Sequence, residues 1–220
     1  MINAKYKATF IENECYHIYN RTNNNELLFR NDDNYAFFLA RYMEITSAYL
    51  DLYSWNLLPT HFHLLVKVKN YTEIYNHLLK IPTEELVLTE KKFLSHRVTM
   101  HQLIDNLFQR FLISYCMKFN SKHERKGNLL HRPFKHKLID KESQFTQAII
   151  YINANAVKHG IVKNINAYKW SSYHDIISDE KTNVCRQYIL DWFGGRDQFI
   201  KVINEQTAYY YNADVGIEEE

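Results

Sequence analysis

The chain has 220 residues and a net charge of +2, with 46% hydrophobic and 24% charged residues. These values are typical of a globular protein with one large domain, and the 5 glycines and 3 prolines exclude collagen-like or linker-rich chains. Because the net charge is small, it does not by itself predict a nucleic-acid partner. The three cysteines lie far apart, which argues against a disulfide framework and against a cysteine zinc site.

The terminal residues and the longest apolar stretches of the chain give an expectation for its cellular location. Residues 1–7 lack the apolar core of a signal peptide, and no stretch reaches the ~18 apolar residues of a membrane span. Together with the scattered cysteines, these features predict a cytoplasmic protein without a membrane partner. The acidic residues 218–220 are expected to be frayed.

Hydrophobic periodicity and turn residues predict alternating strands and helices. The expected elements of the first half are a strand at 15–21, a helix at about 35–47 capped by 32–34, strands at 50–58 and 61–68 joined by Pro59-Thr60, and a short helix from Tyr71. The second half is expected to hold an amphipathic helix at about 101–123, a strand at 134–139, a helix from its cap Ser143 to about 157, and helices near 185–193 and 198–205.

This order predicts an α+β fold, a ferredoxin-like antiparallel sheet with helices on one face. Residues 1–175 are expected to form one domain, in which the polar, weakly periodic residues 83–99 are an insertion. Residues 176–220 are expected to form a helical C-terminal extension.

The sequence His61-Phe62-His63 is the most informative candidate site. It opens an expected strand, and because side chains alternate along a strand, both imidazoles should project from one face. Two parallel imidazoles are half of a metal site. Two hydrogen-bonded core histidines would give the same pattern, so the pair alone leaves both interpretations open.

A second candidate group lies on the expected helix near residue 150. Tyr151 and Asn155 are four residues apart and should share one helix face, although an exposed helix end would also explain them. A divalent cation held by His61, His63 and the Asn155 oxygen would polarise a phosphodiester, and Tyr151 would attack its phosphorus. The product would be a covalent phosphotyrosine, and the reverse attack would rejoin strands.

Four segments resemble those of single-tyrosine transposases with a His-hydrophobic-His motif, in the REP-associated branch. They are His61-Phe62-His63 with its apolar flanks, residues 151–162, the run Trp170-Ser171-Ser172-Tyr173, and residues 130–135. The resemblance covers about residues 14–175. It implies a ferredoxin-like core, dependence on Mg²⁺ or Mn²⁺, cleavage of single-stranded DNA beside a hairpin, and a 5′-phosphotyrosine intermediate.

Carried over to matching positions, the resemblance implies that Tyr151 is the nucleophile and that His61, His63 and Asn155 are metal ligands. The chain departs from the family pattern at Thr60, where Asn or Glu is common, and at Ala156, where Pro is usual. Two imidazoles and an amide are softer ligands than Mg²⁺ prefers, so Mn²⁺ is expected to bind more tightly.

The strongest basic cluster of the chain lies between the two candidate groups, with an extension beyond Tyr151. A solvated loop would account for it, and phosphate contacts along a DNA backbone are the functional interpretation. The residues expected to bind DNA are Lys122, Arg125, Lys126, Arg132, Lys135, Lys137 and Lys158.

Several alternatives stay open at this stage. Tyr115 is a rival nucleophile, but its place on an apolar helix stripe favours core packing. The function expected is a single-stranded DNA transposase, with a metallo-phosphodiesterase, a replication-initiation nuclease and a domesticated DNA-binding protein without cleavage as rivals. Both a monomer and a homodimer are compatible with the sequence.

Overall fold

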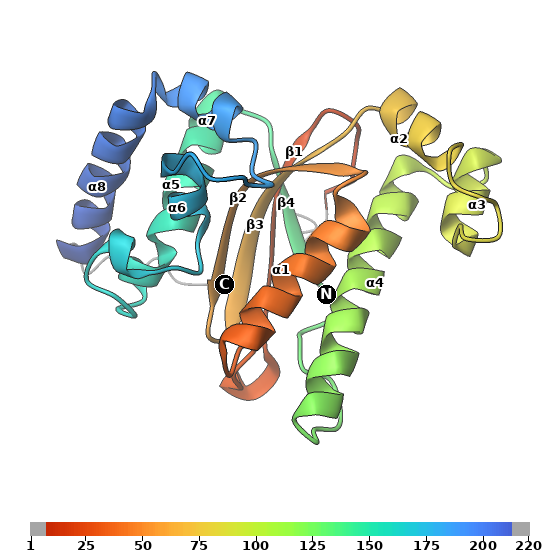
Figure 1. The fold of residues 1–220 in the computed structure, drawn as a ribbon, viewed down its shortest axis with the longest axis horizontal. Helices are drawn as coiled ribbons and strands as arrows, with labels where there is room; N and C mark the ends of the chain where they lie inside the picture. The colour runs from red at the N-terminus through yellow and green to blue at the C-terminus, as the bar shows by residue number, and fades with distance from the viewer. Residues whose placement is uncertain (1–7, 213–220) are drawn as a thin grey trace.

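The computed structural model describes the backbone of residues 8–212 and the side chains of residues 8–208. Its centre is a four-stranded antiparallel sheet with the strand order β2-β3-β1-β4 (Figure 1). The strands are β1 (Cys15–Arg21), β2 (Leu50–Leu58), β3 (His61–Val68) and β4 (Lys135–Ile139). The predicted α+β class and antiparallel sheet are therefore confirmed.

Two of the helices belong to the core of the fold, and the others lie outside it. The helices are α1 (Asp32–Thr46), α2 (Tyr71–Leu78), α3 (Leu88–Leu94), α4 (Met100–Lys122), α5 (Glu142–Lys158), α6 (Ser172–Ile177), α7 (Arg186–Phe193) and α8 (Arg196–Asn212). The succession β1-α1-β2-β3-α4-β4 is the expected ferredoxin-like core. Helix α3 lies within the expected insertion at 83–99, and the acidic tail 218–220 lies outside the described residues.

Helices cover both faces of the sheet, which differs from the prediction of one covered face (Figure 1). On β3, Phe62 contacts Phe38 of α1 at 5.0 Å between ring centroids, whereas its neighbour His63 contacts Tyr151 of α5 at 5.5 Å. Because neighbouring strand residues point to opposite faces, α1 and α5 lie on opposite sides. The central part of β3 is buried on both faces, so both need a helical cover.

The helix ends differ in detail from the predicted caps. Asn31 caps α1 by accepting a hydrogen bond from the Asn34 amide. Helix α5 begins at Glu142, one residue before Ser143, and its N-cap residue Lys141 makes no capping side-chain bond. The prediction that Ser143 caps this helix is therefore wrong, since Ser143 already lies inside it.

The segment after α5 attaches the C-terminal helices to the sheet. Tyr168 donates a hydrogen bond from its hydroxyl to the Leu57 carbonyl at 2.5 Å, and the Leu57 amide donates to the Trp170 carbonyl at 2.9 Å. Helix α8 then packs along α5, as Figure 1 shows. Helix α5 therefore packs against the sheet on one side and against α8 on the other. None of the helices between residues 8 and 212 has the length and apolar character needed to cross a membrane.

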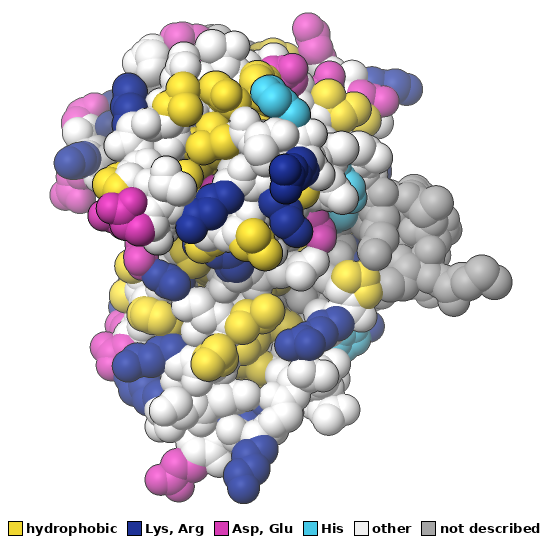
Figure 2. Space-filling view, turned by 90° about the vertical axis from the view of Figure 1, so that its right-hand side faces the viewer, with side chains coloured by type: hydrophobic (Ala, Val, Ile, Leu, Met, Phe, Trp, Pro, Cys, Tyr) yellow, Lys and Arg dark blue, Asp and Glu magenta, His cyan; other side chains and the backbone are white. Residues whose placement is uncertain are grey.

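The side of the molecule that carries α2, α3 and α4 has a mixed surface. Figure 2 shows lysine and arginine side chains interspersed with hydrophobic ones there. Exposed hydrophobic side chains on these helices include Leu88, Ile113 and Met117, and Leu79 directly follows α2. This surface lies away from α5, so it does not border the residues predicted to carry the chemistry.

Candidate functional site

Strand β3 and helix α5 bring the two predicted groups together. The His61 and His63 rings lie on one face of β3 with centroids 5.3 Å apart and perpendicular planes. Tyr151 meets His63 edge-on at 5.5 Å, and His159, which directly follows the last residue of α5, meets His61 at 4.9 Å. The predicted common face of the histidines and the predicted proximity of Tyr151 are both present in the structure.

Asn155 lies on the same stripe of α5, midway between Tyr151 and His159. Residues at positions i, i+4 and i+8 share a helix face, so its amide is directed at the part of β3 that carries His61 and His63. Asn155 is fully buried, and neither its Oδ1 nor its Nδ2 has a hydrogen-bond partner among the described residues. A buried amide without partners costs free energy, which favours a ligand role over a packing role.

Asn153, only two residues away, is a contrasting case. It is equally buried, but its Nδ2 donates to Ser54 Oγ at 3.0 Å and to the Ile149 carbonyl at 2.9 Å. Its Oδ1 accepts a hydrogen bond from Ser172 Oγ at 2.9 Å. Asn153 therefore joins α5 to β2 and to α6, which gives a structural reason for this asparagine and leaves Asn155 as the candidate ligand.

The Nδ1 atom of each motif histidine is engaged by a neighbouring side chain. His63 Nδ1 lies 2.9 Å from His17 Nε2 of β1, and His61 Nδ1 lies 3.0 Å from Thr60 Oγ1. His63 Nε2 is buried and has no hydrogen-bond partner in the described part of the chain. Burial, reinforced by the nearby imidazoles, holds the pKa of His63 well below its usual range, so the ring is neutral and able to ligate a metal.

The donors at this position fit a divalent cation with mixed nitrogen and oxygen ligands. Within residues 8–212, no group of three or more His, Cys, Asp or Glu side chains is arranged to hold a metal ion. A site here therefore depends on the Asn155 oxygen as the ligand that completes the two imidazoles. The observation that supports this fit is that His63 Nε2 and Asn155 Oδ1 are buried and have no hydrogen-bond partner within the described part of the chain.

Three of the predicted DNA-binding lysines lie around the same site. Lys158 Nζ is 4.9 Å from the centre of the Tyr151 ring. Lys135 is paired with Tyr19, and Lys137 with His17, in the β1–β4 register, so both lysines lie on the sheet face that carries the histidines. Lys135 Nζ is 5.8 Å from the centre of the Tyr19 ring. One positive charge therefore lies beside Tyr151, and two more lie on the same sheet face at the β4 edge.

The other predicted DNA-binding residues lie elsewhere. Arg125 donates two 2.6 Å hydrogen bonds to Glu26 and further ones to loop carbonyls, so its guanidinium ties the loop after α4 to the segment after β1. Lys122 is ion-paired with Asp33 at 2.9 Å on the side of α1. Lys126 and Arg132 are exposed in the connection between α4 and β4. In the structure, Arg125 and Lys122 are engaged by carboxylates of the chain itself.

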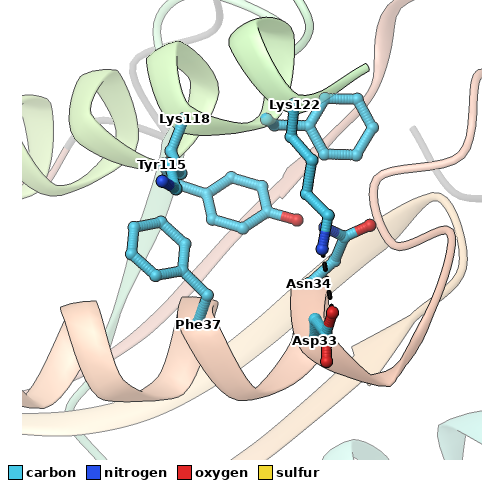
Figure 3. Close-up of a pocket in the computed structure, with 7 residues that line it drawn as sticks. Asp33, Asn34, Phe37, Tyr115, Lys118 and Lys122 are labelled. Carbon is cyan, nitrogen blue, oxygen red and sulfur yellow. Dashed lines mark hydrogen bonds and ion pairs between the residues drawn. The ribbon is translucent and has the colours of Figure 1, made fainter.

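The rival nucleophile Tyr115 lies in the core, as predicted from its apolar stripe. It is 1% exposed, and its hydroxyl donates to the Leu28 carbonyl at 2.6 Å. It also borders a cavity of about 160 Å³ between α1 and α4, which Figure 3 shows with Lys118 and Lys122 at its rim. The dashed contact in Figure 3 is the Lys122–Asp33 ion pair. The residues that line this cavity come from α1 and α4 and include none of the histidine site.

Sequence reasoning predicted DNA binding for Lys158 but not its contact with the Tyr151 ring, and it did not predict the contact of His17 with His63. His17 lies in the strand predicted at 15–21, but its contact with His63 depends on β1 lying beside β3, which local pattern does not reveal. A signal was nevertheless present for Lys158. It lies seven residues after Tyr151, two turns along one helix face.

Comparisons with known proteins agree with this architecture. No family model matches the chain. A Haemophilus influenzae protein whose name assigns it to the REP-associated tyrosine transposases is 26% identical over 147 residues, which is 66% of this chain and 68% of that protein. A solved structure of a REP-associated tyrosine transposase bound to a REP hairpin has a TM-score of 0.54 at 15% identity, covering 79% of this chain and 85% of that one. The resemblance noted in the sequence is confirmed.

Proposed function

We propose that this chain, a relative of the REP-associated tyrosine transposases in sequence and fold, is a metal-dependent transposase that cleaves and rejoins single-stranded DNA beside a hairpin. The observation that carries the proposal is that Tyr151 contacts His63 and His159 contacts His61. Asn155 lies between these two contacts on the chain, and its amide has no hydrogen-bond partner among the residues that the structure describes. A structural role alone would not require these groups to converge. The choice of a hairpin substrate is supported by the solved relative, which is bound to a REP hairpin.

His61, His63 and Asn155 would hold a Mg²⁺ or Mn²⁺ ion, which supplies Lewis-acid polarisation of the scissile phosphodiester. The Tyr151 oxygen attacks the phosphorus and gives up its phenolic proton. The bond from phosphorus to the 3′ oxygen breaks, and that oxygen takes up a proton, leaving a 3′ hydroxyl. Tyr151 then carries the 5′ phosphate of the other strand end.

The chain's own charges support this sequence of events. Lys158 places a positive charge beside the Tyr151 ring, where it stabilises both the phenolate and the phosphate that joins it. Lys135 and Lys137 lie on the same sheet face and would contact the DNA backbone. Because the phosphotyrosine bond retains the energy of the broken link, attack by another 3′ hydroxyl rejoins strands without a nucleotide cofactor.

The proposal is tested with single-stranded DNA that carries the palindromes flanking the protein's own gene. We expect, in the presence of Mn²⁺, a covalent protein–DNA adduct on a denaturing gel, and no adduct with Tyr151→Phe or His63→Ala. Tyr115→Phe is the matched control, because Tyr115 is buried in the core, and it should form the adduct. Hairpin binding without any adduct would instead identify a DNA-binding protein that does not cleave.

A further inference from the structure

We infer that His17 is a positioning residue for the metal site, which accepts a hydrogen bond from His63 Nδ1 and thereby presents the lone pair of His63 Nε2. This inference rests on the proposed metal-dependent function. It concerns a residue outside the His-Phe-His motif and outside the tyrosine helix. Its basis is the 2.9 Å contact between His17 Nε2 and His63 Nδ1 across β1 and β3.

The direction of this hydrogen bond decides whether His63 can ligate a metal. In a neutral imidazole, one ring nitrogen donates a proton and the other accepts one. If His17 donated to His63 Nδ1, the His63 proton would sit on Nε2 and block metal binding there. If His63 donates instead, its Nε2 lone pair is available, and His17 must carry its own proton on Nδ1. Only the second arrangement is compatible with a metal on His63 Nε2.

The surroundings of His17 favour such a fixed role. The β1–β3 register pairs Tyr19 with His63 and His17 with Leu65, so the two imidazoles are diagonal neighbours on the face covered by α5. The His17 ring also meets the Tyr151 ring at 6.0 Å and stacks on Tyr19 at 4.9 Å. Two aromatic rings, those of Tyr19 and Tyr151, therefore hold the His17 ring against His63, as expected of a side chain that orients a ligand.

Thr60 provides an independent parallel at the other motif histidine. Its Oγ1 lies 3.0 Å from His61 Nδ1 and is able to accept a hydrogen bond from it. Each candidate metal-ligating imidazole thus has an acceptor at Nδ1, supplied by a different element. Hydrogen bonding of the distal ring nitrogen is the usual way in which proteins orient metal-bound histidines.

The test compares Mn²⁺ affinity in His17→Leu, which removes the acceptor, and His17→Gln, whose amide oxygen restores one. We expect a 10- to 100-fold weaker Mn²⁺ affinity for His17→Leu, roughly the effect of losing an outer hydrogen bond to a ligand. His17→Gln should stay within about threefold of wild type. His136→Leu is the matched control, because His136 is buried on the opposite sheet face and contacts the Ala8 carbonyl, so it should leave the affinity unchanged.

A second measurement reads the hydrogen-bond direction itself. Long-range ¹H–¹⁵N spectra of the metal-free protein should show the His63 proton on Nδ1 in the wild type and in His17→Gln. Equal affinity in wild type and His17→Leu, or a His63 proton on Nε2, would overturn the inference. Electron-spin-echo spectra of bound Mn²⁺ should show two imidazoles, and a third from His17 would make it a ligand and overturn its positioning role. If His63→Ala binds Mn²⁺ as wild type does, the proposed function fails instead.

Discussion

Replacing Asn155 by leucine should stabilise the metal-free protein while it removes a proposed metal ligand. The Asn155 side chain is fully buried, and both amide atoms lack a hydrogen-bond partner among the described residues. A buried polar group without a partner costs about 1–3 kcal/mol, and leucine has the same branched shape without polar atoms, although its methyl groups are larger. We therefore expect the free energy of unfolding to rise by about 1–3 kcal/mol, reduced by any misfit of the branched side chain.

Asn153→Leu is the matched control, because the two asparagines share burial, helix and side-chain type. Asn153 exchanges hydrogen bonds with Ser54 and Ser172, and leucine would leave these buried hydroxyls with fewer partners. The free energy of unfolding should then fall by about 1–3 kcal/mol. Two similar substitutions two residues apart are thus expected to change stability in opposite directions.

The assay is thermal and urea unfolding with EDTA present, so that no metal contributes. For a chain of this size, 1 kcal/mol shifts the unfolding midpoint by roughly 2–4 °C, which is readily measured. If Asn155→Leu destabilises the protein as strongly as Asn153→Leu, then Asn155 has structural partners and the argument for its ligand role is refuted. Such opposition between stability and function is common at ligand sites.

Three further predictions follow from other contacts. Ser172→Ala should lower the free energy of unfolding by about 1–3 kcal/mol in urea titrations. The reason is that the buried Ser172 hydroxyl forms hydrogen bonds with Ser54, Asn153 and the Trp55 amide. An unchanged urea midpoint would contradict that network. Replacing both Lys135 and Lys137 by alanine should make the slope of log K against log salt for single-stranded DNA binding shallower by about 1.4. Arg125→Ala should lower stability and leave this slope unchanged. A shallower slope for Arg125→Ala alone would place the DNA contacts on the loop after α4. Burial raises the pKa of Asp175, so the folded state holds its proton more strongly than the unfolded state, and this residue costs stability as pH rises above 3.8. Asp175→Asn, which retains an acceptor for Trp55, should therefore gain stability relative to wild type as pH rises, and a pH-independent difference in urea unfolding would refute this.

Local pattern was sufficient to predict the parts of the site that lie within one element. Alternation along 61–68 predicted that His61 and His63 share one face of a strand. Helical spacing predicted that Tyr151 and Asn155 share one face of a helix. Pro59 and Thr60 marked the hairpin turn, which the Leu58–His61 pairing confirms. These features depend on residues close in sequence, whose geometry is set by the strand and helix periods.

Features that depend on long-range packing were not predictable in this way. Arg125 was expected to bind DNA, and its hydrogen bond to Glu26, which lies 99 residues away in the sequence, could not be read from the basic run around it. The His17–His63 contact requires β1 to lie beside β3 in the sheet. Helix α5 was expected on the same side as α1, because nothing in its own periodicity tells which sheet face it covers. Each of these outcomes is decided by tertiary packing rather than by local preference.

The most direct test of the central claim is to locate the covalent bond. The protein is incubated with Mn²⁺ and hairpin-bearing single-stranded DNA, digested with nuclease and trypsin, and its peptides are analysed by mass spectrometry. The account predicts a nucleotide linked through its 5′ phosphate to Tyr151 of α5. A nucleotide on any other residue, or an adduct that forms equally in Tyr151→Phe, would contradict it.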